Sequence, residues 1–383
     1  MTEEFNSSNH PPLPPTTEDD RHAWLRLLRS RKVGPATFHR LLNEHGTAQN
    51  ALAALPEVAR TAGIEGYEIC PAGVIDAEFK AARAAKARLL CLGDPDYPQT
   101  LADIADAPPV LWTIGDPAYL SAPMIALVGA RNASSLGTRM ARALAAELGE
   151  AGFVIVSGLA RGVDAAAHLA ALKTGTVAVM AGGVDSIYPA ENAGLAFEIG
   201  AKGLRLSEQP MGLTAQARHF PRRNRIISGL ARAVVVVEAA ARSGSLITAR
   251  DALDQGRDVL AVPGHPFDAR AAGCNMLIRD GAQLVRNAAD VIAALPERGA
   301  AARPAQPDLW AEIPAPPPEK RSLRETAALH QQILARLGPS PVAEDQLIRD
   351  LSVPAGRVGP VLVDLELDGK IQRQSGGLLS LAR

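Results

Sequence analysis

One segment indicates the fold most clearly: Phe153-Val154-Ile155-Val156-Ser157-Gly158-Leu159-Ala160-Arg161-Gly162-Val163-Asp164, which is followed by a helix-like segment through His168. Its first four residues form an apolar run that ends in a glycine-containing loop, which is typical of a buried strand. Strand, glycine loop and helix units that repeat along a chain form a parallel, doubly wound sheet. Ligands of such sheets bind at the carboxyl ends of the strands, so the loop after this strand is a candidate site.

The same unit recurs along the middle of the chain. Further strands are expected at 125–128, 177–180, 204–208, 234–237 and 259–262. Four of the strand ends are rich in small residues, which let the backbone approach a ligand, and the amides at the following helix starts favour anions. The sequence has neither a G-x-G-x-x-G dinucleotide motif nor a Walker A lysine pattern. We therefore expect a Rossmann-like sheet that uses no cofactor.

An arginine-rich segment follows the fourth strand. From Arg218 to Arg250 the chain has seven arginines and a single acid, Glu238, although its total net charge is −1. Arginine binds phosphate oxygens through two parallel hydrogen bonds, so the segment predicts an anion site. The alternative is a solvated arginine face. We expect 220–227 to be an extended loop, in which Arg223 and Arg225 face one way and Arg222 and Asn224 face the other.

The composition of the 383 residues limits the class of protein. Aromatic residues make up 4% of the chain, which argues against a surface built mainly on base stacking. The three cysteines have no paired spacing, so we expect a reducing compartment, no disulfide framework and no metal site. Residues 1–20 lack the pattern of a signal peptide, and no apolar run is long enough to cross a bilayer. These features predict a cytoplasmic protein without membrane contact.

Composition and periodicity divide the chain into five parts. Helical spacing of apolar residues marks an N-terminal domain, and the glycine turn at 32–37 resembles a helix-hairpin-helix (SAM-like) module, although a plain helical hairpin is favoured. A proline- and alanine-rich stretch marks a linker. The expected parts are a disordered tail 1–21, an N-terminal helical domain 22–90, a Rossmann-like domain 91–294 that holds the anion site, a linker 295–324 and a winged-helix domain 325–383.

The last part carries the pattern of a winged helix. Helical stretches at 329–337 and 343–351 precede a third helix with an apolar face, which Pro360 interrupts, and a strand pair turns at Gly376-Gly377. From Pro341 onward there are five basic and six acidic residues. This acidic balance is poor for reading DNA, so we favour a protein-contact or structural role.

Several motifs, in this order along the chain, resemble those of the DNA-processing protein A (DprA, or Smf) family. The loop 157–164 with Ala167-His168 is similar to the family pattern S-G-x-A-x-G-[IV]-D…A-H. The other matching groups are Tyr188-Pro189 with Asn192 and Leu195, Phe220–Ile227, Ser243–Ala249, Ala261–Gly264, and Gly273-Cys274-Asn275 with Leu277-Ile278 and Gly281-Ala282. The resemblance covers almost all of the sheet domain and extends more loosely to both flanking domains.

The resemblance implies a homodimer that binds single-stranded DNA without a catalytic step. Such proteins protect incoming strands during natural transformation and help to load RecA. Together with the donors expected in the loop after 153–156, the implied DNA-binding set is Arg131, Ser157, Gly158, Gly162, Lys173, Asn192, Arg222, Arg223, Asn224, Arg225, Ser243, Gly244 and Ser245. Asp164 and Thr248 are instead expected to cap helices, Asp164 because a carboxylate repels phosphate.

Some of these residues have a second interpretation. Arg131 either contacts phosphate or forms a salt bridge to Glu208 or Glu238, and Asn224 either contacts the nucleic acid or holds its loop. Glu238 either orients nearby arginines or is catalytic. His168 is expected to be a core histidine.

Two other functions are open alternatives. The runner-up is a nucleotide phosphoribohydrolase of the lysine-decarboxylase-like group, whose P-G-G-x-G-T-x-x-E loop supplies a catalytic acid. The corresponding loop here, 242–249, has no acid. A transcription factor acting through the winged helix is disfavoured by the acidic balance of that domain.

Overall fold

The computed structural model describes residues 14–295, 323–338, 341–351, 353, 358, 361–362, 365–366, 368, 370–374 and 378–381. The chain forms two compact units, Met1–Glu297 and Arg298–Arg383, which are described separately. Most of the expected tail and linker, the Pro360 interruption and the Gly376-Gly377 turn lie outside the described residues. None of the helices in the described ranges combines the length and the apolar character that crossing a bilayer requires.

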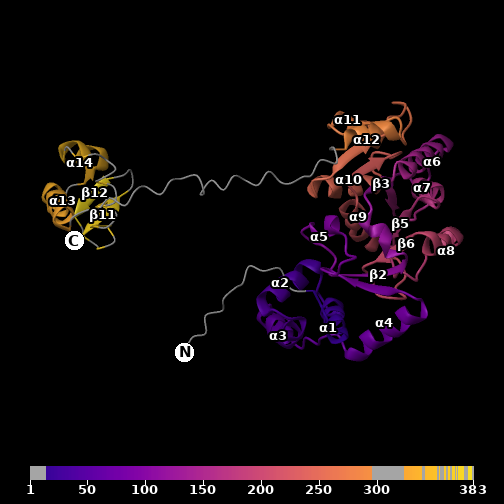
Figure 1. The fold of residues 1–383 in the computed structure, drawn as a ribbon, viewed down its shortest axis with the longest axis horizontal. Helices are drawn as coiled ribbons and strands as arrows, with labels where there is room; N and C mark the ends of the chain where they lie inside the picture. Colours follow the sequence, from indigo (N-terminus) through magenta and orange to yellow (C-terminus); the bar gives the residue numbers. More distant parts are fainter. Residues whose placement is uncertain are drawn as a thin grey trace. The chain divides into compact units, whose positions relative to one another are not determined.

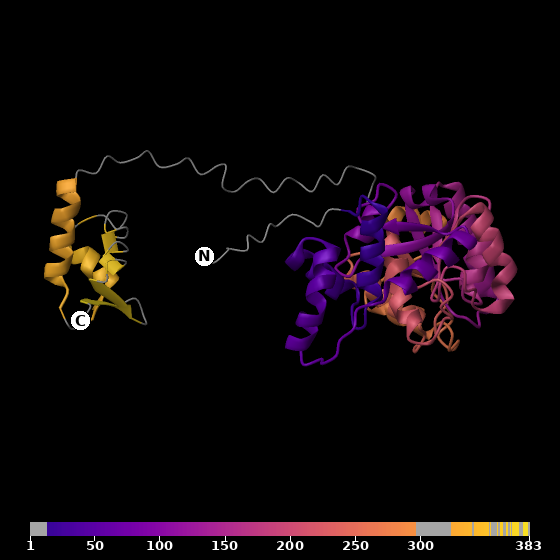
Figure 2. The same ribbon diagram turned by 90° about the horizontal axis from the view of Figure 1, so that it is seen from below.

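The first unit begins with four packed helices, which Figure 2 shows as the indigo and violet segment beside the sheet. They are α1 (Glu18–Arg29), α2 (Pro35–His45), α3 (Ala48–Thr61) and α4 (Ala72–Ala84). Trp24 and Phe38 pack edge to face in their core. The expectation of a tail through residue 21 was wrong at its end, because Thr17 and Asp20 form a capping box that starts α1 at Glu18. The acids of this first turn favour the helix start.

A nine-stranded sheet follows within residues 14–295 (Figure 1). Its order is β1-β2-β6-β5-β4-β3-β7-β8-β9, with parallel pairing from β6 to β9 and antiparallel pairing of β2 to β6 and β1 to β2. The strands are β1 (Arg88–Cys91), β2 (Val110–Gly115), β3 (Met124–Val128), β4 (Val154–Ser157), β5 (Thr176–Val179), β6 (Leu204–Ser207), β7 (Ala233–Val236), β8 (Asp258–Ala261) and β9 (Gln283–Leu284).

The six strands expected from the sequence are confirmed, whereas β1, β2 and β9 were not predicted. β1 and β2 flank a turn-rich junction that hides their pattern, and β9 has two residues. β1 also spans the expected domain boundary between residues 90 and 91, so the sheet begins on the N-terminal side of that boundary.

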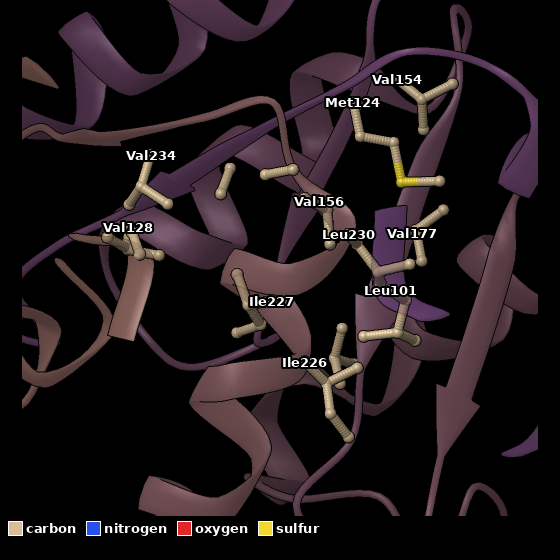
Figure 3. Close-up of a cluster of buried hydrophobic side chains, with 14 of the residues drawn as sticks. Leu101, Met124, Val128, Val154, Val156, Val177, Ile226, Ile227, Leu230 and Val234 are labelled. Atoms are coloured by element: carbon tan, nitrogen blue, oxygen red, sulfur yellow. The ribbon is translucent and has the colours of Figure 1, made fainter. Parts of the chain in front are cut away.

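Helices cover both faces of the sheet, because the central strands are apolar on both sides. On β3, Met124 and Val128 face one helical layer, while Ile125 and Leu127 face the other. The first layer, part of which Figure 3 shows, contains α5 (Gln99–Ala102), α9 (His219–Leu230), α10 (Ser245–Asp254) and α11 (Ala272–Arg279). The second contains α6 (Ser135–Glu150), α7 (Val163–Ala171), α8 (Ala193–Lys202) and α12 (Ala288–Ala294). Two short 3-10 turns are η1 (Pro117–Ser121) and η2 (Ala190–Asn192).

The second unit is a winged helix, as expected. Its elements are α13 (Leu323–Arg336), β10 (Val342–Ala343), α14 (Glu344–Leu351), β11 (Ile371–Gln374) and β12 (Leu378–Leu381), with sheet order β10-β12-β11. Val358, Val361, Leu362 and Leu365 lie in helical conformation and are buried against Ile333, Leu347 and Leu379. The apolar face predicted for the third helix is therefore the core of this unit.

Candidate nucleic-acid interface

A cleft of about 870 Å³ lies at the carboxyl ends of the parallel strands; we call it the strand-end cleft. Its walls come from the loops after β3 and β4, the first turns of α9, and the loop between β7 and α10. The charged residues that line it are Arg131, Asp164, Arg223, Arg242 and Arg270. Four guanidinium groups and one carboxylate make the cleft cationic, as an anion site requires.

The loop after β4 is held by its own side chains. The Ser157 hydroxyl donates to the carbonyl of Leu127 (2.6 Å), so this buried hydroxyl does not face the cleft. Asp164 accepts hydrogen bonds from the amides of Gly158 (3.2 Å) and Ala160 (3.3 Å). The donors expected to meet a ligand are thus engaged inside the protein, and Asp164 holds the loop through its amides.

Two further predicted residues support the same loop. Asn192 donates to the carbonyls of Leu159 (2.9 Å) and Ala160 (3.2 Å). Gly162 has a φ of 76°, and a Cβ there would overlap the carbonyl oxygen of Ala130. The loops after β3 and β4 therefore approach each other at a place that only glycine fits.

Arg223 is the central side chain below the cleft. It is 5% exposed, and its Nη1 donates to the carbonyls of Gly158 (2.5 Å) and Val179 (2.7 Å), at the ends of β4 and β5. Burial lowers the pKa of Arg223 to about 10, so the group stays charged at neutral pH and Asp164 supplies the opposite charge. Arg223 thus ties α9 to two strand ends and contributes positive charge to the cleft floor.

The expected extended loop at 220–227 was wrong, because the segment lies within α9. A helix places residues three and four apart on one face. Arg222 and Arg225 therefore line one cavity, while Arg223 and Asn224 line the strand-end cleft. The predicted pairing of Arg223 with Arg225 is replaced by this grouping.

Arg222 and Arg225 face a second cavity of about 640 Å³, the acidic cavity, which Asp103, Asp106, Asp251 and Asp254 also line. Arg225 bonds to Glu208 (2.5 Å) and Asp106 (3.0 Å), so its charge is compensated inside the protein. Burial, with Asp106 and Asp254 adding to it, raises the pKa of Asp251 to about 6. This cavity is unfavourable for a phosphate.

Arg131 faces the cleft and is exposed. Its guanidinium lies 4.7 Å from the ring centre of Phe220, and the ring of Tyr188 meets Phe220 at 5.7 Å. The alternative salt bridge is not formed, because Glu208 pairs with Arg225 and Glu238 is engaged elsewhere.

The DNA-binding set expected from the sequence did not include four residues that line the cleft: Tyr188, Phe220, Arg242 and Arg270. The proximity of Phe220 to the arginines was the available signal.

Glu238 follows β7 and is buried. It accepts hydrogen bonds from the amide (2.9 Å) and hydroxyl (3.2 Å) of Ser134, the N-cap of α6, and Arg270 lies 3.4 Å away. The carboxylate therefore stabilises the start of α6, which favours charge pairing over catalysis.

The start of α10 forms the opposite wall. The hydroxyls of Ser243 and Ser245 bond to each other (2.8 Å), and Gly244 is the helix N-cap. Thr248 was expected to cap this helix but lies one turn inside it, buried at the cleft. Lys173 is exposed just before β5, at the edge of the sheet opposite to the cleft, so the structure does not bring it to the other candidates.

His168 is buried beneath the loop after β4. Its Nε2 accepts from the amide of Leu159 (3.3 Å), so Nδ1 carries the proton and donates to the hydroxyl of Thr176 (2.7 Å). That hydroxyl donates in turn to the carbonyl of Ile155 (2.8 Å). The neutral ring therefore satisfies a buried amide and a buried hydroxyl, which is a structural role.

We expect this histidine to make the fold acid-sensitive. Burial, and secondarily the charge of Arg223, lowers the pKa of His168 to about 3. A depressed folded-state pKa gives stabilisation that is complete above the unfolded-state pKa of about 6.5 and is lost as the pH falls toward 3. Between pH 7 and pH 5 the parent should lose roughly 2 kcal/mol more unfolding free energy than His168→Gln. Urea denaturation at the two pH values measures this, and equal losses would contradict the assignment.

The structure defines a Rossmann-like protein with a cationic strand-end cleft, an N-terminal helical domain and a winged helix. Residues 88–296 match the family model of DNA recombination-mediator protein A, residues 18–81 the DprA-like N-terminal HHH domain, and residues 316–377 the DprA winged helix domain. Protein Smf from Synechocystis sp. is 32% identical over 92% of this chain and 96% of its own length. The chain belongs to the DNA recombination-mediator protein A (DprA/Smf) family.

The similar solved structures include two DNA processing proteins A. The X-ray structure of DNA processing protein A from Streptococcus pneumoniae is 36% identical, with a TM-score of 0.61, over 72% of this chain and 98% of that chain. DNA processing protein A from Helicobacter pylori, described for its single-stranded DNA binding mode, is 30% identical, with a TM-score of 0.51, over 54% of this chain and 94% of that chain. These matches confirm the family expected from the motifs and the fold class.

Proposed function

We propose that this protein binds single-stranded DNA in the strand-end cleft, protects incoming strands and helps to load RecA during natural transformation. The observation that carries the proposal is the charge of the cleft. Four arginines and one buried carboxylate line it, and although Arg270 pairs with Glu238 and Asp268, Arg131 and Arg242 have no carboxylate partner among the described residues. The similar protein from Helicobacter pylori, whose structure concerns single-stranded DNA binding, supports this ligand. A homodimer that works without a catalytic step is part of the same proposal.

The cleft offers two kinds of contact to a strand. Arg131 and Arg242 are exposed at its rim and have no carboxylate partner among the described residues, so they are available to phosphates. The aromatic rings of Phe220 and Tyr188 also line the cleft, so an unpaired base that enters it meets an aromatic surface. Bases of a duplex are stacked on each other, so we expect a preference for single strands.

Substitution of the two rim arginines tests the proposal. Each of Arg131→Ala and Arg242→Ala should weaken single-strand binding. The slope of log K against log salt concentration should become less steep by about 0.7, because one phosphate contact is lost. The effect should be similar on all base sequences, since phosphate contacts carry no base information. Fluorescence titration of single- and double-stranded oligonucleotides across a salt series measures it.

Arg222→Ala and Lys173→Ala are the matched controls, because the structure places these exposed cations outside the cleft. Circular dichroism checks that every variant is folded. The proposal fails if folded Arg131→Ala and Arg242→Ala proteins bind single strands like the parent at every salt concentration.

A further inference from the structure

The outer face of α6 carries a cationic strip that begins at the rim of the strand-end cleft. Arg131 lies in the loop before this helix, and Leu136, in its first turn, is 65% exposed. Arg139 and Arg142 follow on the exposed side, and neither has a carboxylate partner within the described ranges. With a rise of 1.5 Å per residue, Arg142 lies about 10 Å along the helix from Ser135.

Helix stability does not explain this strip. The two arginines are three residues apart, so their like charges repel on one face. They lie in the N-terminal half of α6, while Glu147 and Glu150 lie in its last turn. This arrangement opposes the helix dipole, which favours acids at the start and bases at the end. The sequence places positive charge next to the cleft although the helix itself gains nothing from it.

The other side of the cleft offers no such route. The strand-end cleft and the acidic cavity meet at Pro221, which lines both. A strand leaving over α9 and α10 would therefore meet the four aspartates of the acidic cavity. Two arginines line the same cavity, but Arg225 is already bound to Asp106 and Glu208, so Arg222 alone faces the aspartates. Phosphates are repelled there and attracted along α6.

We propose that α6 is the exit path of the bound strand, with Arg139 and Arg142 holding phosphates of nucleotides that have left the cleft. The inference rests on the proposed function, since it names where the same ligand continues. Leu136 lies between Arg131 and Arg139 and offers an apolar surface to a base or sugar. The strip therefore matters only for strands longer than the cleft holds.

A length series tests the exit path. The full chain and an Arg139→Ala/Arg142→Ala variant are titrated with oligothymidines from about 4 to about 16 nucleotides, the usual range of single-strand site sizes. The shortest strands should bind both proteins equally. As the strands lengthen, the affinity of the parent should continue to rise after that of the variant has levelled off. On the longest strand the slope of log K against log salt concentration should be steeper for the parent by about 1.4, which corresponds to two phosphate contacts.

Lys80→Ala/Arg83→Ala is the matched control. These two exposed cations are also three residues apart, on α4, and have no ion pair in the described part of the chain. This variant should follow the parent at every length. Equal binding of the α6 variant and the parent to long strands would overturn the exit path, and so would an equal loss at all lengths. If the parent binds no oligothymidine at all, the proposed function itself fails.

Discussion

Replacing Arg223 by alanine is expected to lower the free energy of unfolding by about 3–5 kcal/mol, the usual effect of leaving a buried charge without its compensating opposite charge. Asp164 would keep its buried position without the neighbouring positive charge. The carbonyls of Gly158 and Val179 would also lose their side-chain donor. Because Arg223 and Asp164 line the cleft, single-strand binding should fall together with stability.

Urea denaturation of the parent, Arg223→Ala and Arg222→Ala separates the buried arginine from its exposed neighbour. Arg222→Ala should unfold within about 0.5 kcal/mol of the parent, as is usual for surface substitutions. Arg223→Lys keeps the charge but not the guanidinium geometry, so it should restore only part of the loss. If Arg223→Ala had the same urea midpoint of unfolding as the parent, the arginine would not stabilise the strand ends.

The strands were predictable because burial on both faces of the sheet leaves uninterrupted apolar runs such as that of β4. The helix α9 was not predicted, because its run of arginines was interpreted as an extended loop. Pro221 is in the first turn, where a helix tolerates proline. Arg223, Ile226, Ile227 and Leu230 recur at spacings of three, four and seven, and all are buried. This helical period was the signal that the charge of the segment concealed.

The roles of individual arginines were harder to predict than the site itself. Arg223 bonds to a carbonyl 65 positions away, and Arg225 pairs with an acid from the segment between β1 and β2. Only the folded chain brings such partners together, so the sequence shows where charge gathers but not which charges are compensated internally. Arg131 was expected to contact DNA from the sequence, whereas Arg242 was not. Only the folded chain shows that neither has a carboxylate partner among the described residues.

Gly158→Ala is expected to disturb the same junction from the other side. A Cβ on Gly158 would overlap Nη1 of Arg223, so the guanidinium would have to leave the carbonyls it binds. Gly158 is not among the glycines with positive φ, so the added methyl group meets this contact rather than a strained backbone. We expect a loss of about 1–3 kcal/mol in unfolding free energy, as for other overpacked sites.

The double variant Gly158→Ala/Arg223→Ala identifies the cause. Without the Arg223 side chain, the new methyl group occupies space that the guanidinium has left, so Gly158→Ala should have a much smaller effect in this background. The double variant should therefore be more stable than the sum of the two single losses predicts, by the roughly 0.5–3 kcal/mol of coupling free energy that contacting residues show.

Gly152→Ala provides a contrast, since Gly152 has a φ of 89° and a Cβ added there would meet no atom within 4 Å. Its destabilisation reflects backbone conformation and should add to that of Arg223→Ala without coupling. Additive effects of Gly158→Ala and Arg223→Ala would mean that the glycine is required for a reason other than the close approach of this arginine.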